Sequence, residues 1–170
     1  MNSFPSTPTV QDASSALSYP ALIRLVTEID DNGPIPPRRL ADTLADLTQH
    51  CLRRATDMAR SLGLVHLRPG GRLGLTTYGL ELADLYDATA RWARRHAYPS
   101  AVSDFTSRIQ STLALLAATP ALTAEGDSCV PTTDSQLSAD ALADLTRARD
   151  LLDQWLVSNQ AVRGAPETAA

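Results

Sequence analysis

The sequence contains no lysine, and it has fifteen arginines. Arginine suits bidentate contacts with phosphate and guanine, although a GC-rich coding sequence, which favours arginine codons, is the simpler explanation. The two cysteines, Cys51 and Cys129, are too few for a disulfide framework. No apolar run approaches the roughly 20 residues that cross a bilayer, and the N-terminus has no basic-then-apolar signal pattern. We therefore expect a cytoplasmic, reduced protein that contacts no membrane.

Signatures of catalysis are also missing from the sequence. It has no P-loop, no nucleophile elbow and no dinucleotide-binding fingerprint. His50 and Cys51 are neighbours in sequence and point to different sides of a helix, while His96 is remote, so no zinc spacing is present. We expect a protein that is not an enzyme and binds neither metal nor cofactor.

Composition and length favour one helical domain with appendages. The 170 residues are 44% hydrophobic, with abundant alanine and leucine and only eight glycines. This content supports a packed core and favours helices.

Charge is distributed unevenly along the chain. The net charge is −4, which is unusual for a protein that binds nucleic acid. However, residues 17–98 carry +2, residues 34–76 alone carry +4, and residues 99–170 carry −5. The positive charge is therefore concentrated in one segment, and the acidic C-terminal part excludes a protein that coats nucleic acid along its whole length.

The first half of the chain shows three helical patterns. Residues 1–16 are rich in serine, threonine and proline and predict a disordered arm. A first helix is expected from Pro20 to the break at 31–34, and a second, short helix over 38–47. Thr48 is the expected N-cap of a third helix that ends near Ser61, because its hydroxyl can accept from a free backbone N–H.

Two short strands follow, at 64–68 and 72–75, separated by Pro69-Gly70-Gly71, which permits a tight reversal. They need a helix to pack against. That helix is predicted from the N-cap Thr76 to about residue 97, and its broad apolar surface requires a further partner, either another element or another subunit.

The C-terminal part is expected to form two more helices. The spacing predicts a helix over 101–119, with Val102 and Phe105 on its apolar side, a loop over 120–136, and a helix over 137–158. The expected organisation is a domain at 17–98, a helical extension at 99–162 that serves dimerisation, and a flexible tail at 163–170.

Three stretches in the segment 20–97 resemble the winged helix-turn-helix regulators of the MarR and HxlR type. Arg60-Ser61-Leu62-Gly63-Leu64-Val65 is similar to the family's exit from the recognition helix. Leu75-Thr76-Thr77-Tyr78-Gly79 resembles its start of the post-wing helix, and the segment 86–96 resembles the end of that helix. The likeness covers a little under half the chain. The wing here is short, and the extension after Tyr98 is longer than in minimal HxlR-type proteins.

This resemblance implies a mostly α-helical fold with a small two-stranded β-wing. It leaves the extension after Tyr98 unexplained, and we expect the C-terminal helices of that extension to serve dimerisation. The resemblance also implies a homodimer that acts as a transcriptional regulator, with double-stranded DNA as its partner. In such folds the third helix lies in the major groove.

The outer face of that third helix supplies the predicted base contacts. Arg53 and Arg54 can each span guanine O6 and N7, and Gln49 can pair with adenine. Asp57 lies one turn after Arg53 and can hold its guanidinium in place. The arginines that open the second helix and flank the wing tip can reach phosphate or the minor groove. A solvated charged face is the alternative. The predicted DNA-binding residues are Arg38, Arg39, Thr48, Gln49, His50, Arg53, Arg54, Asp57, Arg68 and Arg72.

Aromatic residues after the wing suggest a second site. They could line a cavity for a small aromatic effector, the kind of control that the MarR resemblance implies, or simply pack at a dimer interface. Packing is the simpler interpretation. These residues are Tyr86, Trp92, Tyr98, Phe105 and Trp155.

The sequence therefore predicts a homodimeric regulator, expected to be a repressor, that binds a pseudo-palindromic operator and blocks polymerase sterically. One alternative is a winged-helix module that binds protein instead of DNA, which the acidic C-terminal part favours. Another is a thiol-based redox sensor, because a cysteine near a helix N-terminus can have a lowered pKa. Cys51 falls on the buried stripe of its helix, which favours a core role instead.

Overall fold

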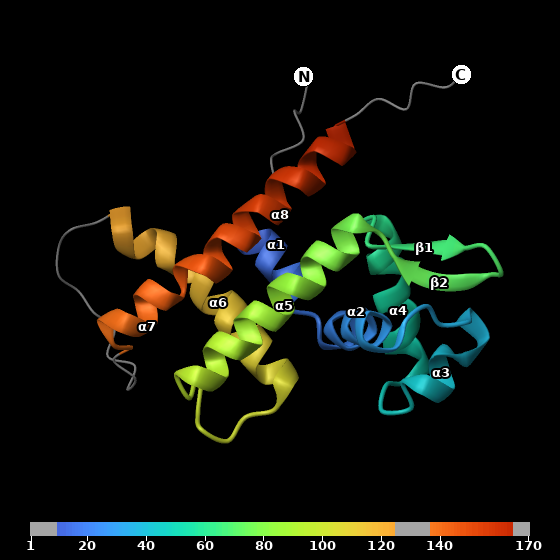
Figure 1. Cartoon of the computed structure of the whole chain (residues 1–170), viewed down its shortest axis with the longest axis horizontal. Helices are drawn as coiled ribbons and strands as arrows, with labels where there is room; N and C mark the ends of the chain where they lie inside the picture. Colours follow the sequence, from blue (N-terminus) through green and yellow to red (C-terminus); the bar gives the residue numbers. More distant parts are fainter. Residues whose placement is uncertain (1–9, 125–136, 165–170) are drawn as a thin grey trace.

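The protein, described by a computed structural model over residues 10–124 and 137–164, is mostly helical with one small two-stranded antiparallel sheet (Figure 1). This confirms the expected helix-rich class with a β-hairpin. The elements are α1 (Val10–Leu17), α2 (Pro20–Asn32), the 3-10 helix η1 (Pro37–Arg39), α3 (Leu40–Thr43), α4 (Gln49–Ser61), β1 (Val65–Arg68), β2 (Arg72–Leu75), α5 (Thr77–Arg95), α6 (Phe105–Ala124), α7 (Ala139–Asp144) and α8 (Thr146–Gly164).

Helix α2 is the inner support of the N-terminal half. It begins at Pro20, which suits the first turn because it lacks an N–H. Its apolar side chains are buried, and it packs against both α4 and α5. The helix ends at Gly33, whose φ of +82° suits glycine and whose N–H donates to the Ile29 carbonyl. The predicted bounds of this helix are confirmed.

The hairpin is closed by the predicted reversal. Val65 pairs with Leu75 and Arg68 with Arg72, while Gly70 and Gly71 adopt φ values of +89° and +70°. A backbone bridge between Ile35 and Leu73, with N–O distances of 3.0 and 2.8 Å, ties the hairpin to the segment before η1. The hairpin is therefore fixed to the segment that leads into η1 and α3.

The start of α5 lies unusually close to the end of α4. The Thr76 hydroxyl donates to the Gly63 carbonyl at 2.6 Å and accepts from the Gly79 N–H at 3.2 Å. A Cβ at Gly79 would lie 2.2 Å from the Leu64 carbonyl oxygen. The prediction that Thr76 caps this helix is confirmed. Glycine is required at position 79 because the backbone there lies against the backbone of Leu64.

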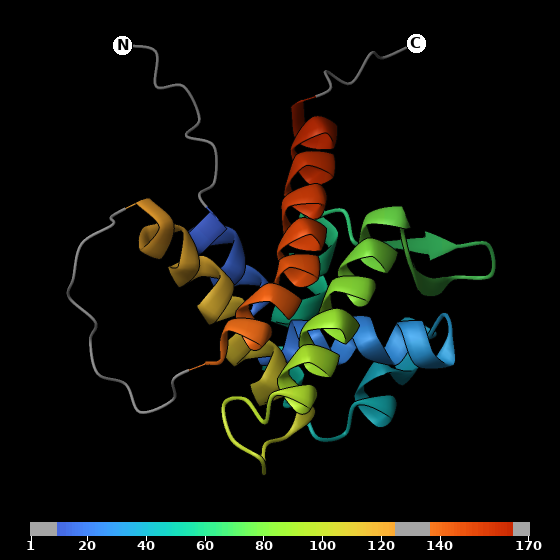
Figure 2. The ribbon, with the colours of Figure 1, turned by 60° about the vertical axis from the view of Figure 1, so that its left-hand side comes forward.

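Helix α5 crosses the molecule and contacts α2, α6 and α8. Both ribbon views show this arrangement (Figures 1 and 2). Its side chains Leu82, Leu85 and Tyr86 are fully buried. The expected further partner of this apolar helix is therefore supplied by α6 and α8 of the same chain. One buried cluster runs from Leu17 to Leu156, so the C-terminal helices share the core of the N-terminal half.

The structure differs from several of the expected boundaries. The predicted disordered arm ends in a helix, α1, because Ser14 and Leu17 are buried and α1 packs against α6. Helix α6 begins at Phe105, leaving Val102 93% exposed, and it continues past 119 to Ala124. The last predicted helix is two helices, interrupted at Leu145.

The second predicted helix is also shorter than expected, since η1 and α3 end at Thr43. Helix α8 extends to Gly164, into the expected tail. Residues 1–9, 125–136 and 165–170, which include part of the predicted arm, most of the predicted loop with Cys129, and the rest of the tail, lie outside the described residues. Among the helices that are described, none is both long and apolar enough to cross a membrane.

Candidate nucleic-acid interface

Helix α4 is anchored at its N-terminus by the predicted cap. The Thr48 side chain accepts a hydrogen bond from the Cys51 N–H at 3.2 Å. The inner face of α4 buries Leu52, Ala55 and Ala59. Gln49, at the first helical position, is exposed. The cap and the buried face together fix which side of α4 faces outward.

The outward face of α4 forms a shallow hollow with charged walls. It is lined by His50, Arg53, Arg54, Asp57, Met58 and Ser61. The structure therefore brings together four of the predicted DNA-binding residues, His50, Arg53, Arg54 and Asp57.

The expected pairing of Arg53 with Asp57 is not present, and within the described chain neither side chain takes part in an ion pair. The order of the charges explains this, because an acid followed by a base four residues later is the favourable arrangement on a helix and the reverse is weaker. The Arg53 guanidinium is therefore available to an external anion.

Arg54 lies at the edge of this face against an aromatic ring. Its guanidinium carbon is 5.0 Å from the centre of the Tyr19 ring, within cation–π distance. Cys51 lies beside them, partly buried and packed against the edge of the core, so its predicted place on the apolar stripe of α4 is confirmed although the thiol is not fully buried. Hydrogen bonding to Thr48 and then to Tyr19 lowers the pKa of the Cys51 thiol, and the nearby Arg54 charge acts in the same direction.

An ion pair braces the turn between α3 and α4. Arg24 of α2 donates from Nε and Nη2 to the two carboxylate oxygens of Asp46, at 3.2 and 3.3 Å. This bond lowers the pKa of Asp46 and raises that of Arg24. Because the pair is about half exposed, it adds little to stability, and its main effect is to hold the turn in place. Neither residue was singled out from the sequence.

A second hollow lies between η1 and the hairpin turn. It is lined by Pro36, Pro37, Arg38, Gly70, Gly71 and Arg72. The structure therefore brings Arg38 and Arg72, predicted phosphate contacts from separate elements, to one site. Arg39 is exposed in η1 but does not line this hollow.

Arg68 is oriented differently from the expectation that it extends from the wing tip. Its Nη2 donates to the Leu75 carbonyl at 3.5 Å, and its side chain covers Gly74, where a Cβ would come within 2.5 Å of Nε. Arg68 therefore folds back along the hairpin because glycine leaves space for it there. His66 is exposed on the same strand.

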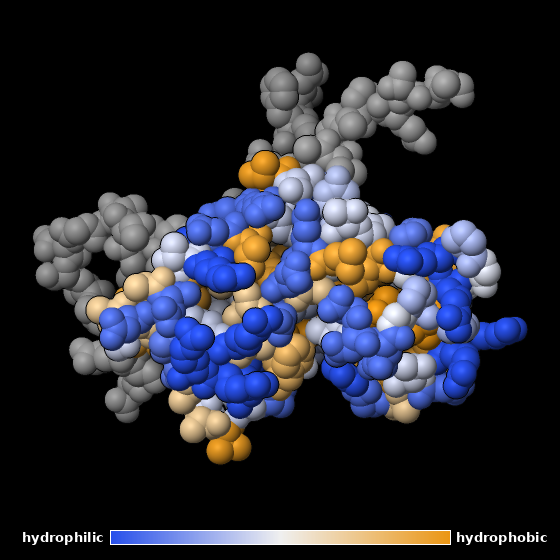
Figure 3. All heavy atoms as spheres, in the orientation of Figure 1, coloured by the Kyte–Doolittle hydropathy of each residue, from blue (hydrophilic) through white to orange (hydrophobic). Residues whose placement is uncertain are grey.

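Hydrophilic residues dominate the hairpin end of the molecule in Figure 3, which shows one face. Hydrophobic atoms on that face gather nearer its centre, over the start of α5, where Leu80 is 46% exposed. The end that carries β1, β2 and α3 is thus polar and arginine-bearing.

The five aromatic residues predicted to line an effector cavity or to pack at a dimer interface do not gather at one place. Tyr86 is fully buried and its hydroxyl donates to the Leu17 carbonyl at 2.7 Å. Trp155 Nε1 donates to the Tyr78 carbonyl at 3.0 Å, near the start of α5, whereas Trp92 lies about 20 Å away near its end. The structure therefore does not place these residues around one cavity, and their packing at a dimer interface stays a prediction.

Trp92 has neighbours of its own at the end of α5. Its Nε1 donates to the Ala141 carbonyl at 2.8 Å, and Tyr98 meets its ring edge-to-face at 5.5 Å. Phe105 begins α6 with 36% of its surface exposed. Trp92 alone of the five predicted residues lines the cavity between α5 and α8.

Sequence reasoning also missed a contact between α8 and the end of α4. Asn159, which is 7% exposed, donates from Nδ2 to the Leu62 carbonyl at 2.9 Å. The only available signal was a polar residue one turn after Trp155 on an amphipathic helix. Through Asn159 and Trp155, α8 contacts both the end of α4 and the start of α5.

No group of three or more histidine, cysteine or acidic side chains that could hold a metal ion occurs in residues 10–124 and 137–164. A scan against protein-family models found no matching family, and searches of curated proteins and of solved structures found no match either. The site is therefore interpreted from its own geometry.

Proposed function

We propose that the protein is a winged helix-turn-helix regulator of transcription that binds double-stranded DNA. The observation that carries this proposal is the outward face of α4, whose Arg53 makes no ion pair with any described residue. Beside α4, the hollow between η1 and the hairpin turn carries Arg38 and Arg72. Two arginine-bearing sites on adjacent elements fit the division between base contacts and backbone contacts.

In this function α4 enters the major groove and the hairpin lies against the neighbouring backbone. Arg53 binds guanine and Gln49 binds adenine, and each good bidentate contact is worth about 1–3 kcal/mol of discrimination. Arg38 and Arg72 bind phosphate. Arg54, stacked on Tyr19, is positioned at the edge of the groove.

We further propose that the protein acts as a homodimer on a pseudo-palindromic operator and represses by blocking polymerase. Two exposed apolar side chains support self-association: Leu80 at the start of α5 and Val157 of α8, which are 46% and 70% exposed. The two helices meet here through the Trp155–Tyr78 hydrogen bond. Replacing both Leu80 and Val157 with glutamate should shift the protein toward monomer in sedimentation, while Val102→Glu, at an exposed site elsewhere, should not.

A thiol-based redox sensor is a second candidate, favoured by one observation. Cys51 lies at the N-terminal turn of α4, is only partly buried and has a lowered pKa for the reasons given above. Oxidation there would add bulk beside Arg54 and weaken DNA binding. A Cys51→Ser variant whose DNA binding still responds to peroxide would contradict this candidate.

The test of the main proposal is selection of binding duplexes from random sequence, together with DNA from upstream of the protein's own gene. We expect a selective, palindromic motif and a gel shift at low protein concentration. Selection that enriches no motif would contradict the proposal and favour a winged-helix module that binds protein, the role to which the acidic C-terminal part is better suited.

A further inference from the structure

A groove of about 430 Å³ lies between α1 and α6, two helices that pack side by side (Figure 2). Its volume falls within the range of small-molecule sites. Serine and glutamine side chains line its α1 side, and Gln110 and three alanines line its α6 side. Neither helix belongs to the segment 20–97, so the groove is separate from the face of α4 and from the hairpin.

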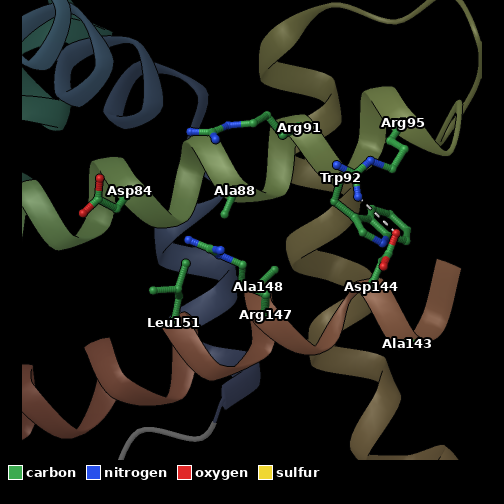
Figure 4. A pocket seen from close by; sticks show the side chains of 10 residues that line it. All are labelled: Asp84, Ala88, Arg91, Trp92, Arg95, Ala143, Asp144, Arg147, Ala148 and Leu151. Atoms are coloured by element: carbon green, nitrogen blue, oxygen red, sulfur yellow. Dashed lines mark hydrogen bonds and ion pairs between the residues drawn. The ribbon is translucent and has the colours of Figure 1, made fainter. Parts of the chain in front are cut away.

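The cavity between α5 and α8 differs from this groove in its charge (Figure 4). Side chains of both signs line that cavity, and its Asp144 already pairs with Arg95 at 3.2 Å. None of the described residues that line the groove between α1 and α6 is charged or aromatic. An ion bound there would lose its hydration without gaining a counter-charge, and an aromatic ring would find no ring to stack on. The lining therefore favours an uncharged, polar ligand.

One buried hydroxyl at this groove is left without a partner among the described residues. Ser14 is 3% exposed, and its Oγ makes no hydrogen bond to any of them. A serine in a helix commonly bonds to the carbonyl four residues earlier, as the Oγ of Ser18 does here to the Ser14 carbonyl. A buried hydroxyl without a partner costs stability. A ligand in the groove would supply the missing hydrogen bond.

Gln110 places a second polar group on the opposite side of the groove. Its Nε2 donates to the Ser18 carbonyl at 2.8 Å, which holds the amide in one orientation. The amide oxygen can accept further hydrogen bonds. Gln11 and Ser15 are exposed beside the groove and add donors and acceptors. The groove therefore presents hydroxyl and amide groups that both donate and accept.

We propose that the groove between α1 and α6 binds an uncharged polyhydroxyl compound, such as a sugar or a cyclic polyol. One hydroxyl of the ligand bonds to Ser14 Oγ, and another donates to Gln110 Oε1. Each ligand hydroxyl both donates and accepts, so such a compound satisfies groups of either kind. Its C–H face lies on Ala114 and Ala117, whose small side chains leave the space. This site is independent of the proposed DNA-binding function.

Binding is tested by calorimetry on the full chain with glucose, sucrose and myo-inositol. Cyclohexanol serves as the control for a ring with a single hydroxyl, and benzoate as the control for an aromatic ion. We expect millimolar or tighter binding of at least one polyhydroxyl probe, and binding of both controls that is at least about tenfold weaker.

Ser14→Ala separates a ligand contact from a structural role. It should weaken binding of the probe about tenfold, yet the ligand-free variant should be at least as stable as the unmodified protein, because an unpaired buried hydroxyl has been removed. Ser111→Ala removes a hydroxyl from α6 outside the groove and should bind normally. Ala114→Leu changes an exposed residue of the groove and should block binding.

Three binding results would overturn the site: no binding of any polyhydroxyl probe, equally tight binding of cyclohexanol, or full binding by Ser14→Ala. A Ser14→Ala protein that is less stable than the unmodified protein would also overturn it, because the hydroxyl would then have a partner within the chain. Sedimentation of Ala114→Leu tests whether a second copy of the chain fills the groove. We expect an unchanged oligomeric state, and a shift toward monomer would assign the groove to self-association and overturn the ligand site.

Discussion

Helices α4 and α5 both present arginines on an exposed face, but the two sets are used differently. On α5, Arg91 pairs with Asp87 and Arg95 with Asp144, which His96 also contacts at 3.2 Å. On α4, no ion pair within the described chain involves Arg53 or Arg54. The order of charges accounts for part of this difference: Asp87 precedes Arg91, whereas Arg53 precedes Asp57. Arg53 and Arg54, whose charge is not neutralised by an ion pair within the described residues, are the arginines that we propose contact DNA.

The largest expected effect comes from removing the α4 arginines. The double variant Arg53→Ala/Arg54→Ala should bind a selected duplex about a hundredfold more weakly, because two contacts of about 1–3 kcal/mol each are lost. The measurement is a gel-shift titration at fixed salt.

The matched control removes the same charge from α5, as Arg91→Ala/Arg94→Ala. Its affinity for the same duplex should stay within about threefold of the unmodified protein, since only long-range electrostatics change. Equal losses in the two double variants would break the comparison between the helices.

A second variant tests the contact that fixes α4 relative to α5. Gly79→Ala should lower the free energy of unfolding by about 3 kcal/mol, because its Cβ would lie 2.2 Å from the Leu64 carbonyl oxygen and the backbones must separate. Gly74→Ala is the control, since the side chain that its Cβ meets, Arg68, can move aside. Chemical denaturation measures both, and a Gly79→Ala protein as stable as Gly74→Ala would refute the close contact.

A third variant tests the contact between α8 and the end of α4. Asn159→Ala should cost about 1 kcal/mol of stability, the usual net value of a buried hydrogen bond. Asn32→Ala removes an exposed amide that donates to Glu28, and it should change stability by less than about 0.5 kcal/mol. Identical unfolding midpoints for the two variants would contradict the role of α8.

The smallest expected effect is the pH dependence of the Arg24–Asp46 pair. The pKa of Asp46 is lower in the folded protein than in the unfolded chain. The contribution of this carboxylate to the free energy of unfolding is therefore complete above the unfolded pKa of about 3.9, and it is lost as the pH falls through the folded pKa. Asp46→Asn should therefore destabilise the protein by less than about 1 kcal/mol near neutral pH, and the difference should vanish in acid. If the difference in stability between Asp46→Asn and the unmodified protein grew in acid, the lowered pKa assigned to Asp46 would be wrong.

Local features of the fold were predictable because their causes are local. Thr48 and Thr76 precede apolar helical patterns and cap them, and Gly70 and Gly71 permit the reversal between two short strands. The outward face of α4 followed from the same periodicity. These signals depend only on neighbouring residues and backbone preferences.

Features that depend on distant contacts were not predictable. The composition of residues 1–16 indicates disorder, yet α1 forms at Val10–Leu17 because it packs on α6, which is about 90 residues away in sequence. Arg68 folds back because Gly74 lies across the hairpin, and Trp155 is an anchor for α5 and not part of a cavity. Such contacts depend on which carbonyls and gaps the completed fold places nearby.

The most direct test of the central claim is the salt dependence of affinity for a selected duplex. If α4, η1 and the hairpin bind DNA with arginines, the logarithm of the binding constant should fall linearly with the logarithm of the salt concentration, with a slope of about −0.9 for each phosphate neutralised. Arg38→Ala/Arg72→Ala should reduce that slope by about two. Binding that is insensitive to salt, or a slope unchanged in this variant, would contradict the account.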